Sequence, residues 1–150
     1  MKSHSEQIRD IKDLKLSKGD FVVQHTGVKF KDYYKVMDNK LLGEGAFGKV
    51  KKCVNIKTKI VHAVKVMEKS KMDKNEKIRL SYEIDILKNL DHPNIVKLYE
   101  VFEDDRNIYL VTELCTGGEL FDIISDRTFT EREAADIIKQ VLQAIAYCHK

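Results

Sequence analysis

The sequence is 150 residues long, 43% hydrophobic and 34% charged, which suits one globular unit with a core and excludes a wholly disordered chain. Its 27 basic and 24 acidic residues are interspersed, so the net charge of +3 argues against a nucleic-acid-binding surface. No stretch reaches the roughly 18 apolar residues of a membrane span and no signal-peptide core is present, so we expect a cytoplasmic protein with no membrane span.

Residues 1–33 are interpreted as an N-terminal extension. They are mixed in charge and contain one short apolar run, Phe21 to Val23. We therefore expect an arm that packs on a neighbouring domain and has no core of its own.

From Tyr34 to Met67 the pattern is that of three β-strands joined by short connections, which should pair antiparallel. The first two strands flank the sequence LGEGAFGKV at residues 42–50. This segment fits G-x-G-x-x-G, a motif of both Rossmann turns and kinase loops, and all but the last position of a P-loop. The motif alone therefore does not distinguish a Rossmann turn, a kinase loop and a P-loop.

The residues that follow the glycines separate these alternatives. A Rossmann turn and a P-loop both lead into a helix whose N-terminus holds the phosphate, whereas here β-branched residues and a hairpin follow. Val50 also stands where a P-loop needs a Ser or Thr hydroxyl for Mg²⁺. The pattern favours a kinase-type loop, and a glycine-rich hairpin turn without a ligand remains the alternative.

The rest of the chain predicts one inserted helix, two more strands and then helices only. We expect a helix over 74–90 that ends before Pro93, strands over 95–102 and 107–114, and a short helix over 119–126. Thr130 and Glu133 form a capping box that opens a last helix with a wide apolar face. The fold class is α+β, with a five-stranded antiparallel sheet and one inserted helix.

Two charged residues lie among apolar neighbours. Lys65 shares a strand face with Ala63 and Met67, and Glu83 lies within an apolar arc of roughly 200° on the helical wheel. Burying either charge alone would cost several kcal/mol, so we expect Lys65 and Glu83 to form an ion pair on the buried side. A lysine that reaches solvent and a solvated glutamate are the alternatives.

These residues together resemble the small lobe of protein kinases over about Tyr34–Lys150. The resemblance rests on the glycine motif, on Ala63-Val64-Lys65, on Glu83, and on the segment from Leu110 to Glu119. The sequences LDHPNIVKLY at 90–99 and GGELFD at 117–122 are most similar to those of calcium-dependent protein kinases of plants and protists. The segment at 19–25 also resembles the one that precedes the lobe in those enzymes.

The resemblance implies a small lobe over 34–114, then a hinge and the first two large-lobe helices over 115–150. Lys65 would touch the ATP phosphates and Glu83 would hold it in place, as the catalytic residues of this chain. Thr112 would guard the back of the pocket. The implied ATP-binding residues are Leu42, Gly43, Glu44, Gly45, Ala46, Phe47, Gly48, Val50, Ala63, Lys65, Thr112, Glu113, Cys115 and Glu119.

The chain contains no H-R-D-x-x-x-x-N, D-F-G or A-P-E motif, so we expect it to be inactive alone and the Mg²⁺ ligands to lie outside it. It has no EF-hand loop and no metal site of its own. The implied partners are ATP, Mg²⁺, protein substrates with acceptor hydroxyls, and a calcium-binding regulatory domain C-terminal to this chain. A nucleotide-binding pseudokinase and a non-enzymatic interaction domain remain as alternatives.

The three cysteines, Cys53, Cys115 and Cys148, are far apart and lack the spacing of zinc ligands. Their odd number argues against a disulfide framework and fits a reducing compartment. We therefore expect buried, unreactive thiols.

Overall fold

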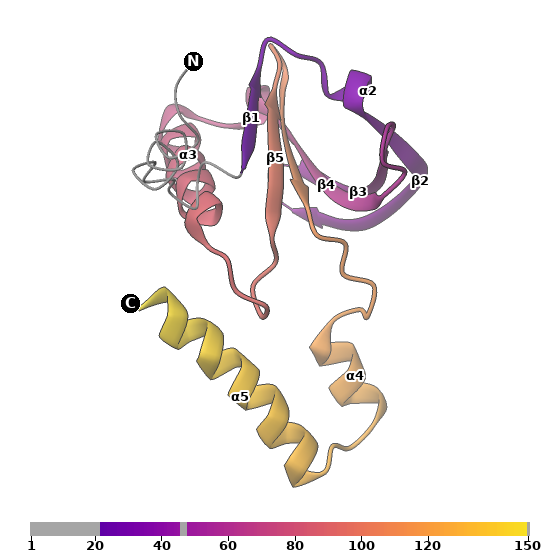
Figure 1. The fold of residues 1–150 in the computed structure, drawn as a ribbon, viewed down its shortest axis with the longest axis vertical. Coiled ribbons are helices and arrows are strands. Elements are labelled where there is room, and N and C mark those ends of the chain that lie inside the picture. The colour runs from indigo at the N-terminus through magenta and orange to yellow at the C-terminus, as the bar shows by residue number, and fades with distance from the viewer. Residues whose placement is uncertain (1–21, 46–47, 150) are drawn as a thin grey trace, which may run out of the picture.

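The computed structural model describes residues 22–45 and 48–149, which form a twisted sheet with helices beside and below it (Figure 1). The elements in chain order are β1 (Val23–Thr26), α2 (Phe30–Tyr33), β2 (Tyr34–Gly45), β3 (Gly48–Asn55), β4 (Val61–Glu68), the 3₁₀ turn η2 (Lys69–Lys71), α3 (Lys74–Asn89), β5 (Leu98–Glu103), β6 (Asn107–Thr112), α4 (Leu120–Asp126) and α5 (Glu131–Cys148).

The sheet has the strand order β1-β5-β6-β4-β3-β2. The five predicted strands, β2 to β6, are all present and pair antiparallel, as expected. The prediction missed a sixth strand, because β1 lies within the expected extension and pairs parallel with β5. Its sequence, VQHT, carries no alternating apolar pattern, so only the backbone pairing at the sheet edge reveals it.

Each face of the sheet has its own core cluster. On one face Met67 of β4 packs with Leu80 and Ile84 of α3, so this face holds the inserted helix. On the other face Val64 of β4 packs with Phe30 of α2. Successive residues of a strand point to opposite faces, so odd-numbered β4 residues face α3 and even-numbered ones face α2.

Capping boxes open both long helices. The box predicted at Thr130 and Glu133 is confirmed. Its hydrogen bonds are exposed to solvent, so they form without burial of the segment. A second box, not predicted, opens α3: Asp73 N–H donates to Glu76 Oε2 at 2.7 Å, and Glu76 N–H donates to Asp73 Oδ1 at 2.8 Å. These bonds satisfy helix N–H groups that have no partner within the helix.

The last helix, α5, is fastened to the loop between α3 and β5. Asp91 N–H donates to Tyr147 Oη at 3.0 Å, and Asn94 Nδ2 donates to Gln140 Oε1 at 3.1 Å. Its wide apolar face is nevertheless uncovered, with Leu142 58% exposed. Over the described part of the chain, no helix combines the length and the apolar character that crossing a membrane would need.

Candidate functional site

The glycine segment forms the closed end of the β2–β3 hairpin. Gly45 pairs with Gly48 and Gly43 pairs with Val50. Ala46 and Phe47, which the sequence places at the tip, lie outside the described residues. A Cβ added at Gly43 or Gly45 would meet no atom within 4 Å, so neither glycine is required by protein packing. The backbone here is bare and faces open space.

Gly48 is a glycine for a different reason. A Cβ at this position would overlap the carbonyl oxygen of Val66 and lie 2.8 Å from its carbonyl carbon, on the neighbouring strand β4. Gly48 is buried and opposite Met67 in the ladder. Its role is therefore close packing between β3 and β4, which the motif pattern did not reveal.

Lys65 lies in the middle of the sheet, in a cross-strand row with apolar residues. It pairs with Val50 on β3 and with Leu110 on β6. Directly opposed residues share a face, so this row lies on the side that carries α3 and continues toward Gly43, which pairs with Val50. Half-buried Lys65 is thus one strand away from the glycine hairpin.

The expected burial of Glu83 is wrong. Helix α3 presents Leu80 and Ile84 to the sheet, with Leu87 partly buried beside them, whereas Glu83 is exposed. On the wheel Glu83 lies about 60° to one side of Leu80, at the border of this stripe. Ile86, which the apolar arc also included, is 59% exposed. Among the described ion pairs, none joins Glu83 to Lys65.

The segment after β6 brings several predicted residues to one edge of the site. Buried Ala63 pairs with Thr112, whose hydroxyl donates to the Glu113 carbonyl oxygen at 3.4 Å. The Glu113 N–H donates to the Lys97 carbonyl oxygen at 2.9 Å. This bond holds the connecting chain against the start of β5, and it involves Lys97, a residue that the sequence did not single out.

Three further predicted residues are exposed around the site. Leu42 and Glu44 lie on β2 beside the glycines, and Glu44 pairs with Lys49 across the hairpin at 3.5 Å. Glu119 occupies the N-cap position of α4, but its side chain makes no capping hydrogen bond. The Glu119 carboxylate is therefore not committed to the helix.

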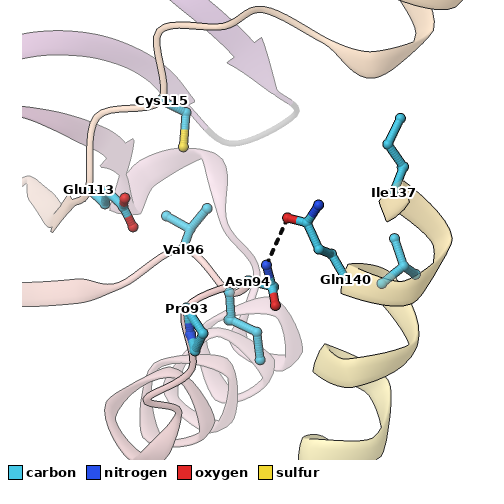
Figure 2. Close-up of a pocket in the computed structure, with 9 residues that line it drawn as sticks. Pro93, Asn94, Val96, Glu113, Cys115, Ile137 and Gln140 are labelled. Carbon is cyan, nitrogen blue, oxygen red and sulfur yellow. Dashed lines mark hydrogen bonds between the residues drawn. The ribbon is translucent and has the colours of Figure 1, made fainter. Parts of the chain in front are cut away.

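A cavity of about 390 Å³ lies between the connecting segment and α5 (Figure 2). Glu113 and Cys115 line one side, and Ile137 and Gln140 line the other. Neither Lys65 nor any residue of β2 or β3 lines this cavity, so it is separate from the glycine hairpin.

The arrangement supplies groups for holding a polyanion but no metal site. It combines bare glycine backbone, one half-buried ammonium and a small buried side chain at Ala63. Within residues 22–45 and 48–149, no cluster of three His, Cys, Asp or Glu side chains could hold a metal ion. A metal that accompanies a bound anion would thus need ligands from elsewhere.

The expectation of three buried thiols is wrong for two of them. Cys53 is fully buried in the α2-side core, and burial, with a contribution from the Glu100 charge, raises its pKa to about 12. Cys115 and Cys148 are exposed.

We predict that two of the three thiols react quickly with a maleimide near neutral pH, and that Cys53 reacts only after denaturation. Mass spectrometry of the labelled chain counts the adducts. Cys115→Ser and Cys148→Ser should each remove one fast adduct, and fast labelling of a third site in the folded chain would contradict the burial of Cys53.

The sequence matches the protein kinase domain family over residues 36–150. It is 50% identical over 114 residues to calcium-dependent protein kinase 5 of Plasmodium berghei, covering 75% of this chain and 20% of that protein.

Two further relatives match over a longer part of the chain. Calcium-dependent protein kinase 3 of Plasmodium yoelii yoelii is 44% identical over 138 residues, which is 91% of this chain and 25% of that protein. Calcium-dependent protein kinase 4 of Plasmodium falciparum is 47% identical over 138 residues, or 91% and 26%. The chain thus spans between a fifth and about a quarter of the length of these relatives.

Proposed function

This chain belongs to the protein kinase family, and from that premise we propose that it forms the ATP-binding part of a Ser/Thr protein kinase. ATP would lie between the β2–β3 hairpin and the segment after β6. The observation that carries this proposal is the position of Lys65, a half-buried cation in an otherwise apolar row that leads directly to the bare glycine backbone.

The two open glycines support phosphate binding. Backbone N–H groups can approach phosphate oxygens closely only where no Cβ intervenes, and Gly43 and Gly45 leave that space free. Packing does not explain them, in contrast to Gly48. The Lys65 ammonium would then neutralise charge on the same phosphates.

The other end of the site supports adenine binding. Val50 and Ala63 offer apolar surface, and the connecting segment offers backbone groups of Glu113 and Cys115. The Glu113 N–H is already bonded to Lys97, so this residue would contribute its carbonyl oxygen. Glu119, with its carboxylate uncommitted, would reach the ribose hydroxyls.

Catalysis would need more than this chain supplies. Mg²⁺ would bind together with the nucleotide, through protein ligands outside the described residues. Its positive charge would offset the negative charge of the phosphates. The chain's own part would be to bind and orient ATP, and we expect it to transfer no phosphate alone. The names of the relatives support calcium regulation of the whole protein, acting through a region outside this chain.

Nucleotide binding by this chain is the direct test. We expect Mg-ATP at ten times its Kd to stabilise the fold by about 1.4 kcal/mol and raise Tm by about 4 °C. The double variant Gly43→Ala/Gly45→Ala should lose most of this shift with an unchanged Tm in the absence of nucleotide, because both positions are open. Calcium chloride alone should give no shift.

The result also separates the alternatives. If Mg-ATP does not stabilise this chain, the proposal is wrong and the result favours the non-enzymatic interaction domain. Binding by the chain, together with no phosphate transfer by the protein that contains it, would identify a pseudokinase.

A further inference from the structure

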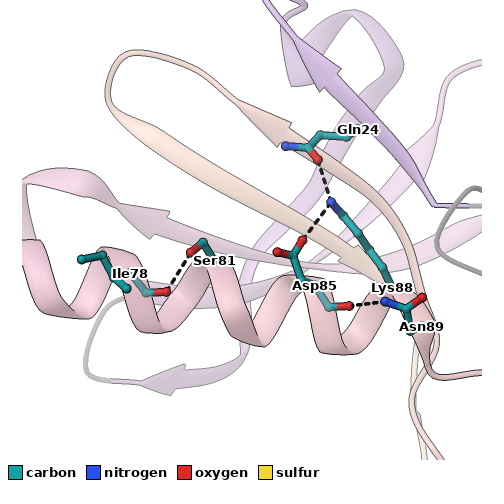
Figure 3. A network of polar contacts seen from close by, with 6 residues as sticks. All are labelled: Gln24, Ile78, Ser81, Asp85, Lys88 and Asn89. Atoms are coloured by element: carbon teal, nitrogen blue, oxygen red, sulfur yellow. Dashed lines mark hydrogen bonds and ion pairs between the residues drawn. The ribbon is translucent and has the colours of Figure 1, made fainter.

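The strand β1 and the C-terminal end of α3 are joined by a polar contact that lies outside the site described above (Figure 3). Lys88 Nζ donates to Gln24 Oε1 at 2.7 Å and lies 3.5 Å from Asp85 Oδ1. The Lys88 side chain is only 16% exposed, so its stem is enclosed between strand and helix. This contact connects residues 64 positions apart.

Apolar packing reinforces this contact. Val22, just before β1, packs against the core cluster that contains Leu80 and Ile84 of α3. Gln24 is paired with Val101 of β5, a member of the same cluster. The side of β1 that faces α3 therefore contributes both a hydrogen bond and apolar contact to the position of the helix.

The opposite side of β1 is anchored to the sheet. The His25 ring stacks on Phe102, with centroids 4.2 Å apart and planes 10° apart. His25 Nε2 lies 2.9 Å from Glu100 Oε2, and the Tyr34 hydroxyl donates to Glu100 Oε1 at 2.6 Å. The strand is thus fixed to β5 on one side while it holds α3 on the other.

We propose that β1 is a clamp that fixes the C-terminal end of α3 against the sheet, with Gln24 as a positioning residue. The clamp precedes residue 36, where the match to the kinase domain begins, so it is an addition to that domain. Holding the C-terminal end of α3 would limit the movement by which Glu83 could approach Lys65. The consequence for the Lys65–Glu83 pair rests on the proposed function, whereas the clamp itself does not.

Hydrogen–deuterium exchange of the whole chain without nucleotide tests the clamp. Gln24→Lys places a second ammonium opposite Lys88, and we expect the amides of residues 82–89 to exchange about threefold to tenfold faster. Amides of β3 and β4 should be unaffected. Ile60→Lys is the control, because it adds the same charge at a 57% exposed position between β3 and β4, away from both β1 and α3.

Rescue distinguishes positioning from general stability. Adding Lys88→Glu to Gln24→Lys restores an opposite-charge pair, and α3 exchange should return toward the wild-type rate. Unchanged α3 exchange in Gln24→Lys, or equal acceleration in every element, would overturn the proposal. If Gln24→Lys does not fold, Gln24→Ala decides by the same criteria. Failure of Mg-ATP binding would leave this readout untouched, so the two proposals fail separately.

Discussion

Lys65→Met is expected to lower phosphate transfer about 10²–10³-fold in an active kinase that contains this chain. Removing the ammonium takes away the one cation in the row that joins the glycine hairpin to the centre of the sheet. Methionine is similar in length and apolar, and its neighbours in the row are Val50 and Leu110, so the fold should remain intact. Radiolabelled phosphate incorporation into a protein substrate measures the loss.

Binding experiments on this chain locate the effect of Lys65→Met. Mg-ATP should bind at least tenfold more weakly, whereas adenosine, which has no phosphate, should bind with unchanged affinity. Lys35→Met is the matched control: it removes an exposed lysine at the other end of β2 and should change neither affinity. Equal loss of ATP and adenosine binding, or undiminished phosphate transfer, would contradict the assigned role.

Gly48→Ala is expected to destabilise the folded chain by about 3 kcal/mol, which corresponds to a fall in Tm of about 10 °C. The added Cβ would overlap the Val66 carbonyl oxygen, a backbone atom that cannot move away without opening the β3–β4 ladder. Flexible side chains can yield to such contacts, but paired strands cannot. Thermal or urea unfolding followed by circular dichroism measures the change.

The other glycines of the motif provide the control for Gly48→Ala. Gly43→Ala and Gly45→Ala should leave the free energy of unfolding within about 0.5 kcal/mol of wild type, because neither Cβ meets an atom within 4 Å. The three substitutions thus separate a structural glycine from two that serve ligand approach. A Gly48→Ala chain as stable as wild type would show that β3 and β4 are less closely packed than described.

Much of the fold follows from local patterns in the sequence. Helix α3 and strand β6 lie within two residues of their predicted ranges, because alternation and periodicity report which side of an element is apolar. The capping residues Thr130 and Glu133 were also identified correctly, since a capping box involves only neighbouring residues. The start of β5 was predicted three residues too early, where a His92–Ile95 turn replaces the ladder.

The structure places Lys65 opposite Val50, which pairs with Gly43 of the glycine hairpin, and strand alternation and the hairpin determine this arrangement together. The roles of Lys65, Glu83 and the hinge residues in nucleotide binding remain predictions. Ala46 and Phe47, two of the implied ATP-binding residues, lie outside the described residues.

By itself, the sequence determined the kinase-type glycine motif, the order of the elements from β2 to α5 and the apolar strand face that contains Lys65. Only the tertiary structure decided that Glu83 is exposed, that β1 joins the sheet, and that Gly48 is needed for packing. The physical reason is that periodicity defines an apolar arc but not how far a helix is rotated when it docks. Rotation, edge pairing and strand spacing depend on the sum of contacts between distant segments, such as those of α3 with β1 and β4.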